Sequence, residues 1–154
     1  MRLTRRFIVK SLDNISLSAP IRYERYYIND KLRIQKKAAY YEKEILNEEN
    51  VVIEKNKITE EEFLNLKKTS YSRIIRDSYL YLNDNSVSIK KYYDTYDGLN
   101  RVEVKFSTKD EMDTYTKEDW MGNEITSSSL AFDKDLSKLS REEFLHELKK
   151  YLSK

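Results

Sequence analysis

The sequence predicts an α+β fold in which a meandering antiparallel β-sheet carries about three packed helices. Eight segments rich in β-branched and aromatic residues alternate between polar and apolar positions, which is typical of half-buried strands. Three further segments begin with the residues of a helix-capping box. The 154 residues show no linker, internal repeat or low-complexity run, so we expect a single domain over residues 1–154.

The predicted strands follow one another through short turns. The clearest is 100–106, where Val102, Val104 and Phe106 alternate with charged residues, so that one face of the strand is charged. Asp30 and the Ala38-Ala39 pair are expected at tight hairpin positions. We predict strands at 3–10, 22–28, 31–37, 40–46, 50–55, 72–82, 86–93 and 100–106.

Each predicted helix opens with a hydroxyl residue that has an acid three positions later. Thr59 opens a helix to about residue 68, Thr108 opens one to about residue 115, and Ser140 precedes a helix at about 141–153. We expect the terminal helix to dock on the outside of the fold, because its apolar residues recur at helical spacing. These residues are Phe144, Leu145, Leu148, Tyr151 and Leu152.

The composition limits the possible functions. The 29 Lys and Arg residues nearly balance the 27 Asp and Glu residues, so the net charge of +2 gives no bulk field for duplex nucleic acid. The absence of cysteine excludes disulfides and thiolate chemistry. The N-terminal apolar run is too short for a signal peptide, and no run approaches the roughly 20 apolar residues of a membrane span. We therefore expect a soluble, cytoplasmic protein without a membrane partner.

Strands with alternating charges have two interpretations. One is an ordinary sheet whose polar face lies in water. The other is a closed barrel with a charged lumen, because about eight strands enclose room for a small ligand. The periodicity alone does not decide between them.

Several motifs favour the barrel, because they resemble those of the CYTH superfamily, the triphosphate tunnel metalloenzymes. Gly98-Leu99, the strand 102–106 and the segment Trp120-Met121-Gly122-Asn123-Glu124-Ile125-Thr126 are similar to that family's Gly-Leu, Glu-x-Glu-Phe strand and Trp-Leu-Gly-x-Glu-Val-Thr motif. Residues 2–9 resemble its Glu-x-Glu-x-Lys-Phe-x-Val start, and residues 25–35 resemble its next strand pair. The resemblance implies an eight-stranded antiparallel barrel, closed or nearly closed, that forms a tunnel.

In that family, basic residues in the tunnel bind a triphosphate, and glutamates hold the divalent metal for its hydrolysis or cyclisation. Here most of the acid positions have changed. They carry Arg2, Thr4, Lys90 and Lys105, whereas Glu103 and Glu124 remain acidic. Of the matching basic positions, Arg6, Arg33 and Arg76 stay cationic, and Gln35 and Ser78 have lost the expected arginines.

The substitutions change the expected chemistry. In a poorly solvated lumen with an effective dielectric of about 20, neighbouring cations would repel a divalent ion by several kcal/mol. We therefore expect a non-catalytic or weakly catalytic protein that binds a triphosphate, polyphosphate or nucleotide and needs no cofactor. Its ligand-binding residues would be Arg6, Arg33, Arg76, Lys90 and Lys105.

Two alternatives remain open at this stage. The protein could be a metal-dependent triphosphatase or cyclase that binds Mg²⁺ or Mn²⁺ at Glu103 and Glu124. Alternatively, internal salt bridges could fill the lumen, for instance between Glu42 or Glu44 and Lys105 or Arg6. In that case the barrel would be a scaffold that binds a protein partner.

Overall fold

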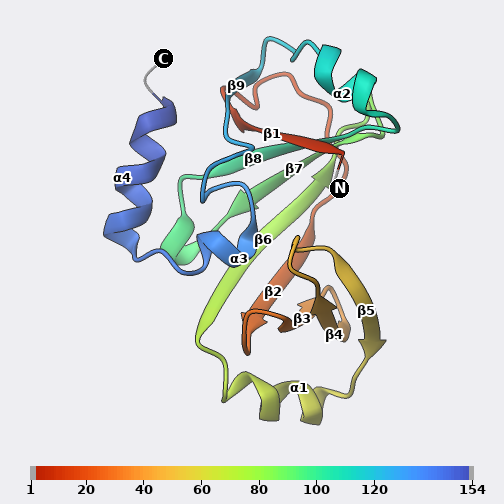
Figure 1. Ribbon diagram of the computed structural model, residues 1–154, viewed down its shortest axis with the longest axis vertical. Helices are drawn as coiled ribbons and strands as arrows, with labels where there is room; N and C mark the ends of the chain where they lie inside the picture. The colour runs from red at the N-terminus through yellow and green to blue at the C-terminus, as the bar shows by residue number, and fades with distance from the viewer. Residues whose placement is uncertain (1–2, 153–154) are drawn as a thin grey trace.

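The computed structural model describes residues 3–152, which form one antiparallel sheet of nine strands, four α-helices and a short 3-10 helix (Figure 1). The order of strands across the sheet is β5-β4-β3-β2-β6-β7-β8-β1-β9. The strands are β1 Thr4–Val9, β2 Ile21–Tyr27, β3 Leu32–Lys37, β4 Tyr40–Leu46, β5 Val52–Lys57, β6 Ser72–Leu80, β7 Val87–Tyr92, β8 Asn100–Lys105 and β9 Met121–Glu124.

All eight predicted strands are present, with ends that differ by up to a few residues. The predicted hairpin at Ala38 is confirmed, since this residue has the positive φ of 52° that a tight turn requires. The number of strands was wrong, because β9 adds a ninth. Its four residues include Gly122 and show no alternation of polar and apolar positions, so no local pattern predicts a strand there.

Of the two forms expected, a closed or a nearly closed barrel, the closed form is wrong, because backbone hydrogen bonds do not close the sheet. Strands β5 and β9 are the two edges of the sheet, and no ladder joins them within residues 3–152. The sheet instead curls around the segment that follows β9, and Figure 1 shows helix α3 (Asp133–Leu136) inside the curve. Leu130 and Leu136 of this segment are fully buried. The segment therefore fills part of the inner side of the curved sheet. The sheet forms a tunnel whose two edge strands, β5 and β9, are not paired with each other.

The three predicted helix starts are confirmed. They are α1 (Glu60–Lys67), α2 (Lys109–Thr114) and α4 (Arg141–Leu152), and residue 153 of the predicted last helix lies outside the described residues. At the start of α4, Ser140 Oγ accepts from the Glu143 amide at 3.1 Å and the Ser140 amide donates to Glu143 Oε1 at 2.9 Å. Helix α3 was not predicted, because four residues are too few to show a period.

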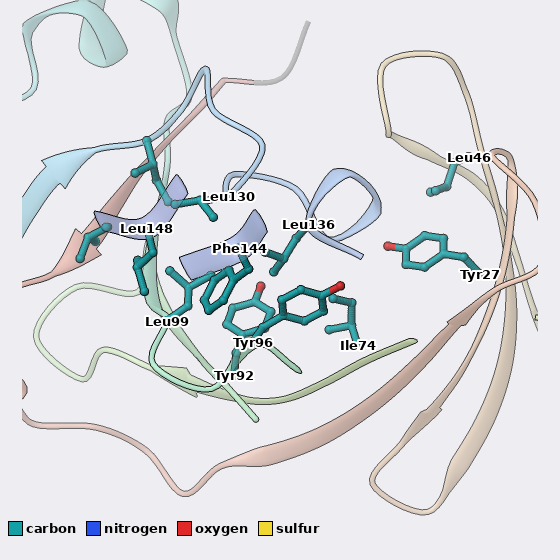
Figure 2. Packing of buried hydrophobic residues seen from close by; sticks show 12 residues of the cluster. Tyr27, Leu46, Ile74, Tyr92, Tyr96, Leu99, Leu130, Leu136, Phe144 and Leu148 are labelled. Carbon is teal, nitrogen blue, oxygen red and sulfur yellow. The ribbon is translucent and has the colours of Figure 1, made fainter. Parts of the chain in front are cut away.

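Helix α4 does more than cover the outside of the sheet. Phe144 and Leu148 are buried in the main apolar cluster, whereas Leu145 and Leu152 are exposed, so the apolar face is narrower than predicted. Figure 2 shows Phe144 and Leu148 beside residues from β7, the 3-10 helix (Asp94–Tyr96) and the segment around Leu130. Helix α4 thus packs against the apolar part of the inner face of the sheet.

Apolar and charged residues divide the inner face along each strand. Because side chains two positions apart share a face, Ile8 lies beside Arg6, and Tyr92 lies beside Lys90. The apolar member of each pair belongs to the main apolar cluster, and the charged member lines a cavity. The outer face is apolar under α1, where Phe63 packs, and on the side of β1, β7 and β8, where Val102 and Val104 are buried with Phe106 packed against them.

No helix within residues 3–152 combines the length and the apolar character needed to cross a bilayer.

Candidate functional site

A basic cavity of about 190 Å³ lies on the charged part of the inner face. Strands from across the curved sheet supply its walls, and the segment with α3 supplies the remaining side. Among residues 3–152, its lining includes eight basic side chains and two carboxylates. The basic residues are Arg6, Arg25, Arg33, Arg76, Lys90, Arg101, Lys105 and Lys134, and the acids are Glu103 and Asp133.

The structure brings together all five residues predicted to bind the ligand. Arg6, Arg33 and Arg76 are 2%, 9% and 4% exposed, so their charges lie inside the fold. Lys90 lies on β7, between β8 and the strand β6 that carries Arg76. Lys105, the exposed last residue of β8, also lines the cavity. The sequence therefore identified five side chains that share one cavity although five different strands carry them.

Asp133 is the centre of the charged network, and the sequence analysis missed it. Its Oδ2 accepts from Arg25 Nη1 at 2.8 Å and from Arg76 Nε at 3.0 Å. Its Oδ1 accepts from the Tyr92 hydroxyl at 2.6 Å and from Arg101 Nη2 at 3.1 Å. Burial alone would raise the pKa of Asp133, but the three guanidinium groups hold its pKa well below the ordinary value.

A second ion pair occupies the wall formed by β3 and β4. Arg33 Nε donates to Glu44 Oε1 at 2.8 Å, and Arg33 Nη1 donates to the Tyr27 hydroxyl at 3.3 Å. Lys55 Nζ of the edge strand lies 3.3 Å from the other oxygen of Glu44. Burial opposes the charge of Glu44, but Arg33 and Arg25 lower its pKa below the ordinary value. This pair differs from the predicted pairing of Glu44 with Lys105 or Arg6.

Glu103 lies between two arginines. Arg101 Nη2 donates to Glu103 Oε2 at 2.9 Å, and Arg6 Nη2 lies 3.9 Å from Glu103 Oε1. Burial would raise the pKa of Glu103, yet the surrounding cations, first Arg101 and then Lys90 and Arg6, lower it strongly. Glu103 is therefore an ionised counter-charge for the cations around it.

Lys90 has no such close partner among the interactions found in residues 3–152. Its Nζ donates to Ser88 Oγ at 3.3 Å. Burial lowers the pKa of Lys90 to about 7, Glu103 opposes the shift, and Arg76 and Arg101 add to it. Lys90 is thus a buried amine that changes its charge near neutral pH.

The two candidate metal ligands are held by different arginines. Glu103 lines the cavity, whereas Glu124 forms a two-point ion pair with Arg5, with distances of 3.0 and 2.6 Å. Thr126 Oγ1 also donates to Glu124 at 2.7 Å. In the part of the chain that the structure describes, no cluster of three or more His, Cys, Asp or Glu side chains is placed to hold a metal ion.

The other altered positions bind neighbours inside the protein. Arg2 lies outside the described residues, and Thr4 Oγ1 accepts from Arg6 Nη1 at 2.9 Å. Gln35 accepts from Arg25 Nε at 2.8 Å and donates to Glu42 Oε2 at 2.6 Å. Ser78 Oγ accepts from Arg76 Nη1. The neutral residues Thr4, Gln35 and Ser78 thus accept hydrogen bonds from the arginines of the cavity.

Four charged cavity residues were not predicted as site residues: Arg25, Arg101, Asp133 and Lys134. Alternation could have identified Arg101, which shares the charged face of β8 with Glu103 and Lys105. The same rule applies to Arg25, two positions from the lining residue Tyr23. Nothing local distinguishes Asp133 from its neighbour Asp135, because only the packing of α3 inside the sheet selects it.

The curved antiparallel sheet around a basic cavity fits the tunnel fold that the sequence resemblance implies. Comparison with solved structures confirms this at the level of the fold. The chain is similar to two crystal structures of NE1496, one described as a hypothetical protein and the other as an inorganic triphosphatase. In the first, the TM-score is 0.74 and the identity 18%, over 91% of this chain and 99% of the neighbour. In the second, the TM-score is 0.71 and the sequence identity is 19%, and the match covers 88% of this chain and 96% of the neighbour.

No family model matches the chain, and no curated protein matches it in sequence.

Proposed function

We propose that the protein binds a phosphorylated anion in the basic cavity, without metal-dependent turnover. The excess of positive charge in the cavity carries this proposal. Even with Lys90 neutral and with Glu44 counted among the acids, the positive charges of the described lining residues exceed the negative ones by four. Guanidinium groups suit phosphate oxygens, because their planar donors form paired, charge-assisted hydrogen bonds.

The fold supports the same ligand class. The neighbour with a stated activity is an inorganic triphosphatase, and its tunnel fold is shared over most of both chains. The cavity volume of about 190 Å³ is smaller than the roughly 300 Å³ at which pockets for drug-sized ligands begin. A compact inorganic phosphate, or the phosphate tail of a nucleotide, fits this size better than an entire nucleotide.

The donor set does not fit a divalent cation. Glu103 forms ion pairs with Arg101 and Arg6, and Glu124 forms an ion pair with Arg5. At an effective dielectric of about 20, a single unit charge 4 Å from another contributes about 4 kcal/mol, and several cations surround Glu103. The chemistry that these residues support is therefore binding and orientation of an anion, with the cavity cations in place of metal.

Calorimetric titration with tripolyphosphate, pyrophosphate and orthophosphate in EDTA tests the proposal. We expect binding in the absence of Mg²⁺ that weakens as the salt concentration rises. Phosphate release with Mg²⁺ or Mn²⁺ should stay at the level of a blank. Metal-dependent hydrolysis above that level would favour the triphosphatase alternative, and no binding of any phosphate would favour the scaffold alternative.

A pair of lysine variants locates the binding. Lys105→Ala should weaken tripolyphosphate binding by about tenfold, which corresponds to about 1.4 kcal/mol, through loss of one cavity cation. Because Lys105 is exposed, the fold should tolerate this change. Lys109→Ala is the matched control, since the Lys109 side chain is 65% exposed and its amine pairs with Asp113 outside the cavity. Equal effects of the two substitutions would place the binding on the general surface.

A further inference from the structure

Asp133 has the hydrogen-bond environment of a bound anion, although it belongs to the protein. Three guanidinium groups and one hydroxyl converge on its two oxygens at 2.6–3.1 Å, and its side chain is 2% exposed. The donors come from β2, β6, β7 and β8, whereas Asp133 enters from α3 on the open side of the sheet. Such a ring of arginines is also what a phosphoryl group would require.

The remaining positive charge lies beside this cluster. Arg6, Lys90 and Lys105 come from β1, β7 and β8. Glu103, which also binds Arg101, is the nearby acid that interacts with Arg6 and Lys90. Lys90 and Lys105 form no ion pair among those found in residues 3–152. An anion bound by these three cations that is long enough to extend toward β2 and β6 would approach the carboxylate of Asp133. Like charges in a poorly solvated site repel strongly.

We propose that Asp133 occupies one phosphoryl position in the cavity and so restricts the accepted anion to the length of a diphosphate. This inference rests on the proposed function and narrows its substrate class. Asp133 is a specificity-determining residue in this scheme. Its carboxylate takes the place of a ligand's negative charge, which also explains how the arginine cluster remains stable without a ligand.

The wild-type protein provides the first test. Titrations with orthophosphate, pyrophosphate and tripolyphosphate in EDTA should show pyrophosphate binding at least as tightly as tripolyphosphate. Charge alone predicts the opposite order, because tripolyphosphate carries more negative charge. Tripolyphosphate binding that is more than about tenfold tighter than pyrophosphate binding would overturn the inference.

Asp133→Asn provides the second test. The amide keeps the shape and one acceptor but removes the charge, so the preference should shift toward tripolyphosphate by about tenfold. Asp135→Asn is the matched control, because it removes the same charge from the same helix at a residue that does not line the cavity. The control should leave the order of the three phosphates unchanged.

The stabilisation of the variant by added phosphate, measured by thermal unfolding, distinguishes the proposed role of Asp133 from a purely structural one. Asp133→Asn should unfold at a lower temperature than the wild type, because three buried guanidinium groups lose a counter-charge. Added tripolyphosphate should then restore more stability to this variant than it adds to the wild type. If Asp133→Asn does not fold, the order in which the wild-type protein binds the three phosphates is by itself the test of the inference.

The outcomes separate this inference from the proposed function. A wild-type protein that binds none of the three phosphates contradicts the proposed function itself. A wild-type protein that binds them, together with an Asp133→Asn variant that keeps the same order of affinities, contradicts only the role assigned to Asp133.

Discussion

The inner face of the sheet has an apolar end and a charged end, and the two differ in how their side chains are buried. On a given strand, only two positions separate a residue of one end from a residue of the other. Ile8 and Tyr92 are nearly or fully buried among apolar side chains under α4. Arg6 and Lys90, their neighbours on the same face, line a cavity with few acids. Burial of apolar surface is a general source of stability, whereas a buried charge costs free energy unless it is paired. We infer that the apolar end stabilises the tunnel, which lets the charged end retain an excess of cations.

The charged end is compensated only in part. Arg33 and Arg76 have carboxylate partners in Glu44 and Asp133, whereas Lys90 and Lys105 form no ion pair among those found in residues 3–152. Substitutions at the apolar end should therefore change stability without changing ligand specificity. Substitutions at the charged end should change both, to a degree that depends on the pairing of the residue.

The largest effect on stability is expected at the apolar end. Phe144→Ala should lower the free energy of unfolding by about 3–5 kcal/mol, because it removes a fully buried ring and leaves a cavity. Urea denaturation measures the change. Leu145→Ala on the same helix is the control, and it should cost much less because Leu145 is 45% exposed. A smaller loss for Phe144→Ala than for Leu145→Ala would contradict a stabilising role for the apolar end.

An intermediate effect is expected at a paired charge. Glu44→Gln should destabilise the protein by about 2–3 kcal/mol, because Arg33 then keeps a buried charge without a counter-ion. Pyrophosphate should offset part of this loss, and urea denaturation with and without the ligand measures it. Glu54→Gln on β5 is the matched control, because Glu54 is exposed. Equal losses for both variants would show that the Arg33 pair is unimportant.

The smallest effect is the pH dependence of Lys90. Its pKa is about 7 in the folded protein and about 10.4 in an unfolded chain, so the unfolded state binds more protons between these values. The free energy of unfolding should therefore gain from Lys90 as the pH rises from about 7 to 9. We expect a contribution of about 1–2 kcal/mol over this range.

Comparison with Lys90→Met isolates this contribution. The variant should lack the part of the pH slope that comes from Lys90, and urea denaturation of both proteins at several pH values measures the difference. A bound phosphate favours the charged amine, so binding above neutral pH should also take up a proton. Identical pH slopes in the two proteins would show that Lys90 has an ordinary pKa.

The sequence by itself determined much of the scaffold. The eight long strands follow from period-two alternation, and the starts of α1, α2 and α4 follow from their capping residues, because these signals are local. The same alternation, together with the resemblance to the tunnel family, placed Arg6, Arg76, Lys90 and Lys105 on inner faces. The cavity brings them together because strand neighbours in a sheet align residues that share a face.

Only the tertiary structure decided how the sheet ends and how its charges are balanced. Strand β9 and helix α3 are too short to show a period, and their positions depend on packing against distant segments. Asp133 lies 57 residues from Arg76 in the chain and 108 from Arg25, so no local pattern links them. The curvature of the sheet brings β2, β6 and β8 around α3, and this long-range geometry turns an unremarkable aspartate into the counter-charge of three arginines.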